Sequence, residues 1–285
     1  MLWRSFVTAS KQIRMSYFNY NYALMRKMPK SFEKEAIRMD ETQEVDFVKA
    51  RQQLDNYKDA LTKLGLQVID LDADEEYPDC IFVEDPAIVI GKKALITRLG
   101  HVNRRGETGP IKEVLQNKLQ LDITEMKDED ATVDGGDVLF TGKEILVGLS
   151  ARTNEKGVKT IAETFPEFPV TGIPVHPTVL HLKSIATMLG DGVMAVGGSS
   201  AANEMFQAVK NKAKFDYKYV ELEKDTSANV LYINGKVVHK TQPELGDHDY
   251  KKLLSNISGD RVEVCMDEMY KVDGCLSCCS ILINN

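Results

Sequence analysis

The sequence repeats one succession of elements five times, and this repeat constrains the fold more than any other feature. In each repeat, a stretch with apolar residues at three- and four-residue intervals, which predicts a helix, runs into a short apolar strand. The strands are centred near Val68, Ile123, Val170, Val220 and Val264, so successive centres lie 55, 47, 50 and 44 residues apart. The helices are expected over residues 46–64, 110–118, 154–165, 201–212 and 247–257.

Paired short runs follow the strands of the first four repeats. Residues 87–90 and 94–97, for example, are apolar runs separated by turn residues, as in a β-hairpin. The fifth repeat has a single run, at 280–284, before the sequence ends. An apolar segment at 20–28 can supply the strand that this last repeat lacks.

A mixed helix-and-strand repeat of about 50 residues is typical of arrays in which each unit buries one face against its neighbours. We therefore expect an α/β fold with its repeats around one axis, closed by the first and last strands so that few edges are exposed. The alternative, an open α/β sheet, would not explain why the order of elements recurs without switching. Because no linker rich in Pro, Gly or Ser divides the chain, we expect a single domain over residues 16–285. Residues 1–15 form an N-terminal extension that is a candidate for disorder.

Composition narrows the class of protein. The chain is 43% hydrophobic and 28% charged, with no apolar run near the ~18 residues of a membrane span. Its net charge of −7 argues against a nucleic-acid surface and suits a small cationic substrate. Five cysteines without a preceding signal-peptide core indicate reduced thiols inside the cell. The first 32 residues contain no acidic residue, as in an organelle transit peptide, so we expect a cytoplasmic protein with a mitochondrial location as the alternative.

Polar residues recur at one phase of the repeat. Asp79, Asp134 and His181 each lie 11 residues after the centre of the preceding strand, and Cys278 lies 14 residues after its strand centre. Equal phase in a radial array places side chains at the same end, around one axis. We therefore expect these four residues to share one site.

Cys278 is the candidate nucleophile. It lies beside Cys279 and three residues after Cys275, in a short loop before an apolar strand, and the thiolate form of such a cysteine is reactive. Strand alternation lets only one of the two adjacent cysteines face the centre, and the residues alone do not decide which. We choose Cys278. A structural zinc site would need a second pair of ligands to match Cys275-x2-Cys278, which the sequence lacks, so we expect no metal site.

His181 and Asp134 are the expected partners of this thiol. A histidine can give and take a proton near neutral pH, and His181 differs from the other four histidines in its phase and its apolar flanks. Asp134 opens the motif Asp-Gly-Gly-Asp, whose glycines allow φ > 0 and close backbone approach, so both carboxylates can turn to one point. The alternative is a turn with solvated acids. With a histidine to orient, Asp134 becomes the third member of a Cys-His-acid set.

Acidic and basic residues suggest what the site binds. Asp79, Glu84 and Asp85 surround a short apolar strand that includes Phe82, and burying such acids is costly without a cation. A planar guanidinium suits paired carboxylates. Candidates for binding a carboxylate are Arg104 and Arg152, although each alone could be an exposed arginine.

These motifs together resemble the guanidino-modifying enzymes of the pentein superfamily, and the dimethylarginine dimethylaminohydrolases most closely. The resemblance covers residues 28–284, and its most specific segments are 78–85, 134–142, 148–154, 180–184 and 272–280. It implies a five-bladed β/α propeller (the pentein fold) with pseudo-fivefold ββαβ repeats around a central active site. One departure is that Cys275 and Ser277 occupy positions where relatives often have Leu and Thr.

The resemblance also implies an activity, the hydrolysis of Nω-methylated L-arginines to L-citrulline and dimethylamine or methylamine. Cys278 would attack the guanidinium carbon and form an S-alkylthiouronium intermediate. His181, oriented by Asp134, would protonate the leaving amine and then activate water. No cofactor is implied, and zinc is an expected inhibitory ligand of Cys278. A monomer or weak homodimer, with no nucleic-acid or membrane partner, is expected.

The resemblance also assigns residues to each end of the substrate. Around the guanidinium lie Glu84, Asp85 and Phe82, and at the α-carboxylate lie Arg104 and Arg152. The α-amino end is assigned to Asp79, the backbone carbonyls of Ile37 and Val272, and the adjacent Asp273. Two alternatives stay open: another guanidino-modifying pentein, such as an arginine deiminase, and a catalytically silent relative that binds a ligand or partner. A deiminase usually carries an inserted helical region, for which 285 residues leave little room, and a silent relative would be expected to have lost a motif residue.

Overall fold

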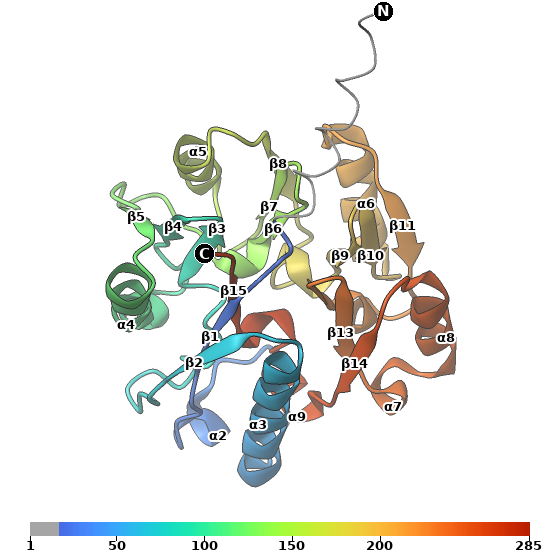
Figure 1. Cartoon of the computed structure of the whole chain (residues 1–285), viewed down its shortest axis with the longest axis horizontal. Coiled ribbons are helices and arrows are strands. Elements are labelled where there is room, and N and C mark those ends of the chain that lie inside the picture. Colours follow the sequence, from blue (N-terminus) through green and yellow to red (C-terminus); the bar gives the residue numbers. More distant parts are fainter. Residues whose placement is uncertain (1–16) are drawn as a thin grey trace, which may run out of the picture.

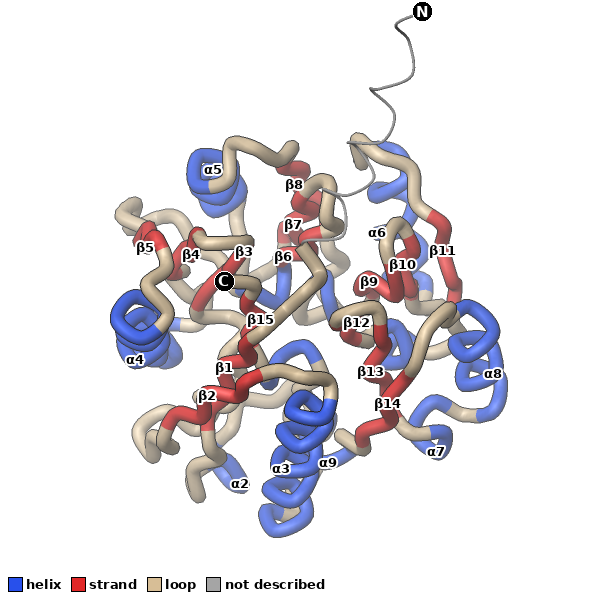
Figure 2. Tube along the Cα trace, viewed as in Figure 1, coloured by secondary structure: helices blue, strands red, loops and turns tan. Residues whose placement is uncertain are grey.

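The computed structural model describes residues 17–285, in which the strands form five three-stranded sheets. The expected N-terminal extension, with its possible transit peptide, lies outside the described residues. Figure 1 shows the sheets arranged around a common centre, and Figure 2 shows most helices on the outside. The expected α/β class is confirmed.

All five sheets have the same strand order. A first strand pairs antiparallel with a middle strand, and the middle strand pairs parallel with an outer strand. The sheets are β15 (Ile281–Ile283), β1 (Tyr22–Arg26) and β2 (Gln67–Leu71); β3 (Ala87–Ile90), β4 (Lys93–Ile96) and β5 (Asp122–Glu125); β6 (Val138–Phe140), β7 (Ile145–Leu149) and β8 (Val170–Pro174); β9 (Ala186–Gly190), β10 (Val193–Val196) and β11 (Lys218–Glu221); β12 (Leu231–Ile233), β13 (Lys236–Lys240) and β14 (Arg261–Val264).

Helices connect the middle strand of each sheet to its outer strand, because parallel neighbours need a crossover. These are α3 (Phe47–Lys63), α4 (Thr108–Glu113), α5 (Glu155–Thr164), α6 (Ser200–Lys212) and α8 (Asp247–Asn256). Three of them begin at a side-chain cap, each worth about 1 kcal/mol. The capping residues are Asp46, Asn154 and Ser199. Shorter helices are α2 (Phe32–Glu35), α7 (Gln242–Leu245) and α9 (Asp267–Tyr270).

The first strand completes the last sheet, as the sequence predicted. In β1, Ala23 pairs with Leu282 of β15 on one side and with Val68 of β2 on the other. The expected segment was 20–28 and the strand is Tyr22–Arg26. This pairing of residues far apart in the sequence joins the two ends of the described chain.

Two boundary predictions differ from the structure. The helix expected at 110–118 begins at Thr108 and changes to a π-helical turn over Val114–Lys118. The centres chosen at Val170 and Val264 lie at the first residue of β8 and the last residue of β14. Each strand has only four or five residues, so its apolar pattern fixes its centre poorly. None of the helices within residues 17–285 has the length and apolar character of a membrane-spanning segment.

Candidate active site

Loops at one edge of the sheets carry the predicted site residues. Because middle and outer strands are parallel, their carboxyl ends lie at the same edge of each sheet. Asp79 and Asp134 follow β2 and β5, while His181 and Cys278 follow β8 and β14. The equal phase seen in the sequence therefore corresponds to the same connection in four different sheets.

These loops enclose a cavity of about 90 Å³, which suits a small molecule. Asp134 and Glu84 do not line this cavity but contact residues that do. Asp134 contacts His181, and the backbone N–H of Glu84 donates to the carbonyl of Cys278. The other ten predicted site residues line the cavity: Ile37, Asp79, Phe82, Asp85, Arg104, Arg152, His181, Val272, Asp273 and Cys278.

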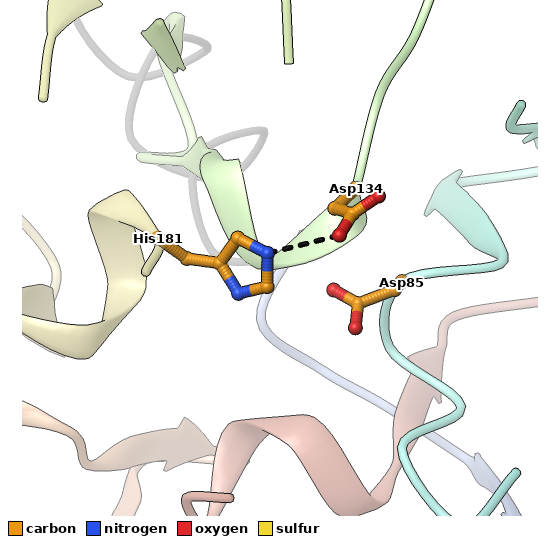
Figure 3. Close-up of side chains that lie close together, drawn as sticks. All are labelled: Asp85, Asp134 and His181. Atoms are coloured by element: carbon orange, nitrogen blue, oxygen red, sulfur yellow. Dashed lines mark hydrogen bonds and ion pairs between the residues drawn. The ribbon is translucent and has the colours of Figure 1, made fainter. Parts of the chain in front are cut away.

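His181 is held by Asp134. Its Nε2 lies 3.0 Å from Oδ2 of Asp134, and both side chains are buried (Figure 3). The other carboxylate oxygen, Oδ1, accepts the backbone N–H of Gly100 at 2.9 Å. The backbone N–H of Asp134 donates to the hydroxyl of Thr153. Asp134 is thus fixed on two sides and in turn orients the imidazole.

The two glycines after Asp134 permit close approach. A side chain on Gly136 would place its Cβ 2.5 Å from Nδ1 of His181, and one on Gly135 would collide with the carbonyl of Glu84. Positive φ was also expected, but the angles of these two glycines are not positive, so that part of the prediction is wrong. The motif needs glycine because neighbouring groups occupy the space of a Cβ.

The second acid of the motif, Asp137, binds the backbone of the residue that follows His181. One oxygen of Asp137 accepts the N–H of Leu182 at 2.9 Å, and the other accepts the hydroxyl of Ser150 at 2.6 Å. The expectation that both carboxylates turn to one point is therefore wrong. Asp134 holds the imidazole, and Asp137 holds the chain next to it.

The pKa of His181 is raised from 6.5 to about 9. Burial alone would lower it, but the Asp85 charge, the hydrogen bond to Asp134 and the Asp137 charge outweigh burial. Figure 3 shows the carboxylates of Asp85 and Asp134 on the same side of the ring. His181 can therefore act as a proton donor at neutral pH.

Asp85 and Arg104 form a buried ion pair. Nη1 of Arg104 lies 2.7 Å from Oδ2 of Asp85, whose Oδ1 accepts the N–H of Gly136 at 2.9 Å. Nε and Nη2 of Arg104 bind the carboxylate of Glu107, and Nη2 also donates to the carbonyl of Phe82. Burial raises the pKa of Asp85, but His181 and Arg104 outweigh it and lower this pKa to about 2. One N–H of Arg104, on Nη1, is left over by these contacts.

Glu84 is held by groups behind the cavity. Its Oε1 accepts Nζ of Lys183 at 2.6 Å, and its Oε2 accepts the hydroxyl of Ser277 at 3.0 Å. The side-chain amide of Asn229 donates to Oγ of Ser277 and to the carbonyl of Lys183. This network fixes Lys183, two positions after His181, and Ser277, directly before Cys278.

The segment after α2 covers one side of the cavity. The backbone N–H of Ile37 donates to both oxygens of Asp79, at 3.2 and 3.3 Å. The N–H of Met39 donates to Asp273 at 2.6 Å, and Asp273 has a positive φ of 59°. Burial raises the pKa of Asp79, and Arg104 opposes that effect. Two acids at this end thus hold the covering segment by its backbone.

Arg152 is the second arginine of the cavity. Its Nη1 lies 4.0 Å from Oδ2 of Asp134, and its side chain is 16% exposed, twice the exposure of Arg104. Arg152 therefore keeps donors that face the cavity.

Cys278 lies in a 3-10 turn, Ser277–Cys279, and not in the strand that follows. It lines the cavity, whereas Cys279 is fully buried and its thiol donates to the carbonyl of Cys275 at 3.6 Å. The alternation of a strand is thus the wrong reason for distinguishing the two cysteines, because the turn separates their directions. A hydrogen bond with Cys275, burial, and the charges of Glu84 and Asp85 raise the pKa of the Cys278 thiol.

Sequence reasoning missed several supporting residues. Glu107, which binds Arg104, follows it by three positions, so a helical ion pair could have been suspected. Asp137 and Lys183 lay inside the quoted motifs but were given no role. Asn229 occupies the fourth sheet's equivalent connection, where no chemistry-bearing residue was noticed. Only the structure shows that Glu107, Asp137 and Asn229 are buried and that Lys183 is mostly so.

Among residues 17–285, two groups of side chains have the spacing to hold a metal ion. One consists of Asp85, Asp134 and His181, whose donor atoms already bind one another or their neighbours. The other consists of Glu223, His248 and Asp249, far along the chain, where Asp249 accepts two backbone N–H groups. Neither group includes a cysteine.

Comparison with known proteins gives consistent results. A family model described as N,N dimethylarginine dimethylhydrolase, eukaryotic, matches residues 21–240. The putative hydrolase DDAH2 of Bos taurus is 39% identical over 171 residues, covering 60% of this chain, which spans only 59% of that relative's length. The N(G),N(G)-dimethylarginine dimethylaminohydrolase of Streptomyces coelicolor is 31% identical over 245 residues, covering 85% of this chain and 88% of that protein.

A solved structure extends the similarity to the fold. The DDAH of Pseudomonas aeruginosa, in a cysteine-to-serine variant complexed with citrulline, matches with a TM-score of 0.81 at 25% identity. The match covers 93% of this chain and all of that one.

Proposed function

The chain belongs to the eukaryotic N,N-dimethylarginine dimethylhydrolase family, and on this premise we propose that it hydrolyses Nω-methylated L-arginines to L-citrulline and an alkylamine. The observation that carries the proposal is the convergence of the Cys278 thiol, the His181–Asp134 pair and a set of carboxylates on one small cavity. The citrulline complex of the bacterial relative supports the choice of product.

Cys278 is the proposed nucleophile. The negative charges of Glu84 and Asp85 disfavour its thiolate in the absence of substrate. A guanidinium bound beside these carboxylates brings a positive charge and lowers the pKa of Cys278. The substrate therefore helps to generate its own nucleophile, and the thiolate adds to the central guanidinium carbon.

His181 is the proposed acid and base. With its pKa raised to about 9, it is protonated at neutral pH and can give its proton to the departing amine. The loss of the amine leaves an S-alkylthiouronium on Cys278. The imidazole, now neutral, takes a proton from water, and the resulting hydroxide attacks the same carbon. The C–S bond then breaks, which releases citrulline and regenerates the Cys278 thiolate. Asp134 keeps the ring in place through both transfers.

The remaining residues are proposed to bind the two ends of the substrate. Asp85, beside Phe82, is proposed to hold the guanidinium, and Glu84, which lies outside the lining, is proposed to add its negative charge. Arg152 is proposed to bind the α-carboxylate, together with the remaining Nη1 hydrogen of Arg104. For the α-amino group we propose Asp79, Asp273 and the carbonyls of Ile37 and Val272.

We also propose that the five sheets are the blades of a pentein propeller, with ββαβ repeats and a single domain over residues 16–285. The identical strand order of the sheets supports this, as does the similarity to the bacterial enzyme. The chemistry above uses only side chains of this chain and needs no cofactor. Zinc as an inhibitory ligand of Cys278, a monomeric or weakly dimeric state and a cytoplasmic location stay predictions.

Citrulline release tests the proposal. The protein should release citrulline from asymmetric dimethylarginine or monomethylarginine, with far less ammonia released from unmodified arginine. Cys278→Ser should abolish turnover while the thermal unfolding of the protein is unchanged, and Cys265→Ser, outside the cavity, serves as a matched control. Full activity of Cys278→Ser would refute the proposal, and faster turnover of unmodified arginine would assign the chain to deiminase chemistry.

A further inference from the structure

Cys275 is a buried thiol next to the nucleophile that the proposed reaction does not use. Its residue is 5% exposed, and its thiol lies near enough to the thiol of Cys278 for each to shift the pKa of the other. The intervening residues Leu276 and Ser277 form a helical turn, which brings positions i and i+3 within about 7 Å at Cα. A disulfide needs Cα atoms within that range, so this turn permits one without unfolding the loop.

We propose that Cys275 and Cys278 form a reversible redox pair, in which a hydroperoxide oxidises Cys278 and Cys275 then closes a disulfide that inactivates the enzyme. The inactivation rests on the proposed function, because it requires Cys278 to be the nucleophile. Formation of the disulfide does not depend on the proposed function.

Access determines which sulfur reacts first. Cys278 lines the cavity, so a small hydroperoxide that enters it meets this thiol, whereas Cys275 is not part of the lining. The Cys278 thiol gives up its proton as its sulfur attacks one peroxide oxygen, the O–O bond breaks, and the other oxygen leaves as hydroxide or alkoxide and is protonated. Cys278 is then a sulfenic acid, with sulfur oxidised by two electrons and the peroxide reduced by two.

Cys275 then resolves the sulfenic acid. Its thiolate attacks the Cys278 sulfur, the S–S bond forms, the S–O bond breaks, and hydroxide leaves and is protonated to water. The net reaction consumes two thiols and one hydroperoxide and yields one disulfide, with water and an alcohol or a second water. A dithiol reductant reverses it by exchange.

The surroundings of Cys275 favour its thiolate. The hydrogen bond with Cys278 lowers the pKa of Cys275, burial opposes this, and the charge of Lys240 lowers it further, to about 7. Lys240 is itself buried at the end of β13, with Nζ 5.0 Å from the ring centre of Tyr270. The charge of a lysine in the protein interior thus favours the thiolate of the resolving cysteine.

Cys279 is excluded as the resolving cysteine. It is fully buried, its thiol donates to the carbonyl of Cys275, and burial raises its pKa. A disulfide between adjacent residues, Cys278 and Cys279, would also be strained. Cys80 and Cys265 are not lining residues of the cavity.

Mass spectrometry after peroxide treatment tests the pair directly. Native protein is treated with hydrogen peroxide, free thiols are alkylated, and the peptide that follows Lys271 is analysed, since it contains all three cysteines. We expect this peptide to lose two hydrogens and to carry a single alkyl group, on Cys279. A linkage that includes Cys279, or three alkylated thiols after loss of activity, would overturn the proposal.

Activity measurements with variants complete the test. Peroxide should abolish citrulline release, and dithiothreitol should restore most of it in the parent protein and in the control Cys265→Ser. In Cys275→Ser and Cys275→Ala the loss should become irreversible, because Cys278 proceeds to the sulfinic acid. Equal recovery in these variants would refute the role of Cys275, and using both guards against one failing to fold. If the reduced protein releases no citrulline at all, the proposed function fails while peptide mapping still decides the disulfide.

Discussion

Asp134→Asn is the most informative single substitution, because the structure determines how the new amide must point. The N–H of Gly100 donates to Oδ1 of Asp134, so this atom stays an oxygen in asparagine. The amide NH₂ then takes the place of Oδ2 and faces Nε2 of His181. A protonated imidazole carries hydrogen on both nitrogens, so it would meet a donor where it now meets an acceptor.

The magnitude follows from the pKa of His181. Its rise from 6.5 to about 9 corresponds to about 3 kcal/mol in favour of the imidazolium, supplied by Asp85, Asp134 and Asp137 against burial. Removing the charge and the hydrogen bond of Asp134 should lower this pKa by at least about one unit. With the loss of orientation, kcat should fall by about 10²–10⁴. KM should change little, because Asp134 does not line the cavity.

Initial rates of citrulline release over a pH series give kcat and KM, and NMR titration of His181 in a Cys278→Ser background gives its pKa. Asp122→Asn, an exposed residue of β5, is the matched control and should behave as the parent protein. A kcat of Asp134→Asn within about three-fold of the parent would refute the argument that Asp134 orients the acid, given the 10²–10⁴ expected of such a group.

Three further predictions concern the same site. Because folding raises the pKa of His181, the protonated imidazole contributes stability that is fully present below about pH 6.5 and is lost as pH rises through about 9. Over the same upper range kcat should decline, and a flat kcat profile there would contradict the role of the imidazolium. Lys183→Met leaves Glu84 without its cation, so urea unfolding should show a loss of about 3–5 kcal/mol, and an unchanged midpoint would show that the pair is not buried in solution. Gly136→Ala places a Cβ 2.5 Å from Nδ1 of His181 and should cost about 1–3 kcal/mol and most activity, whereas Gly109→Ala, with open space at its Cβ, should not.

The repeat made the fold predictable at the level of element order. Five helix-then-strand units were visible because each helix buries a stripe and each strand is apolar, and the missing strand of the last unit pointed to the segment at Tyr22–Arg26. Boundaries were less accurate because strands of three to five residues, such as β8, carry little periodicity.

The residues of the cavity could also be predicted from the sequence, because the same connection recurs in successive sheets. The contacts that surround each of them could not be predicted. Arg104 was expected to face a ligand carboxylate, yet most of its donors bind Asp85, Glu107 and Phe82. Such long-range pairs depend on how loops from different sheets pack, which no local pattern records. The role of the glycines was likewise set by a neighbouring imidazole, not by their own backbone angles.

The most direct test of the central claim is to trap the covalent intermediate on Cys278. S-methyl-L-thiocitrulline releases methanethiol, which departs as a weak base and needs little help from an acid, so His181→Gly should still form the adduct but fail to hydrolyse it. Intact-protein and peptide mass spectrometry should then find one thiouronium group, on Cys278. An adduct on Cys275 or Cys279, or citrulline release without any adduct in a Cys278→Ser variant, would contradict the account.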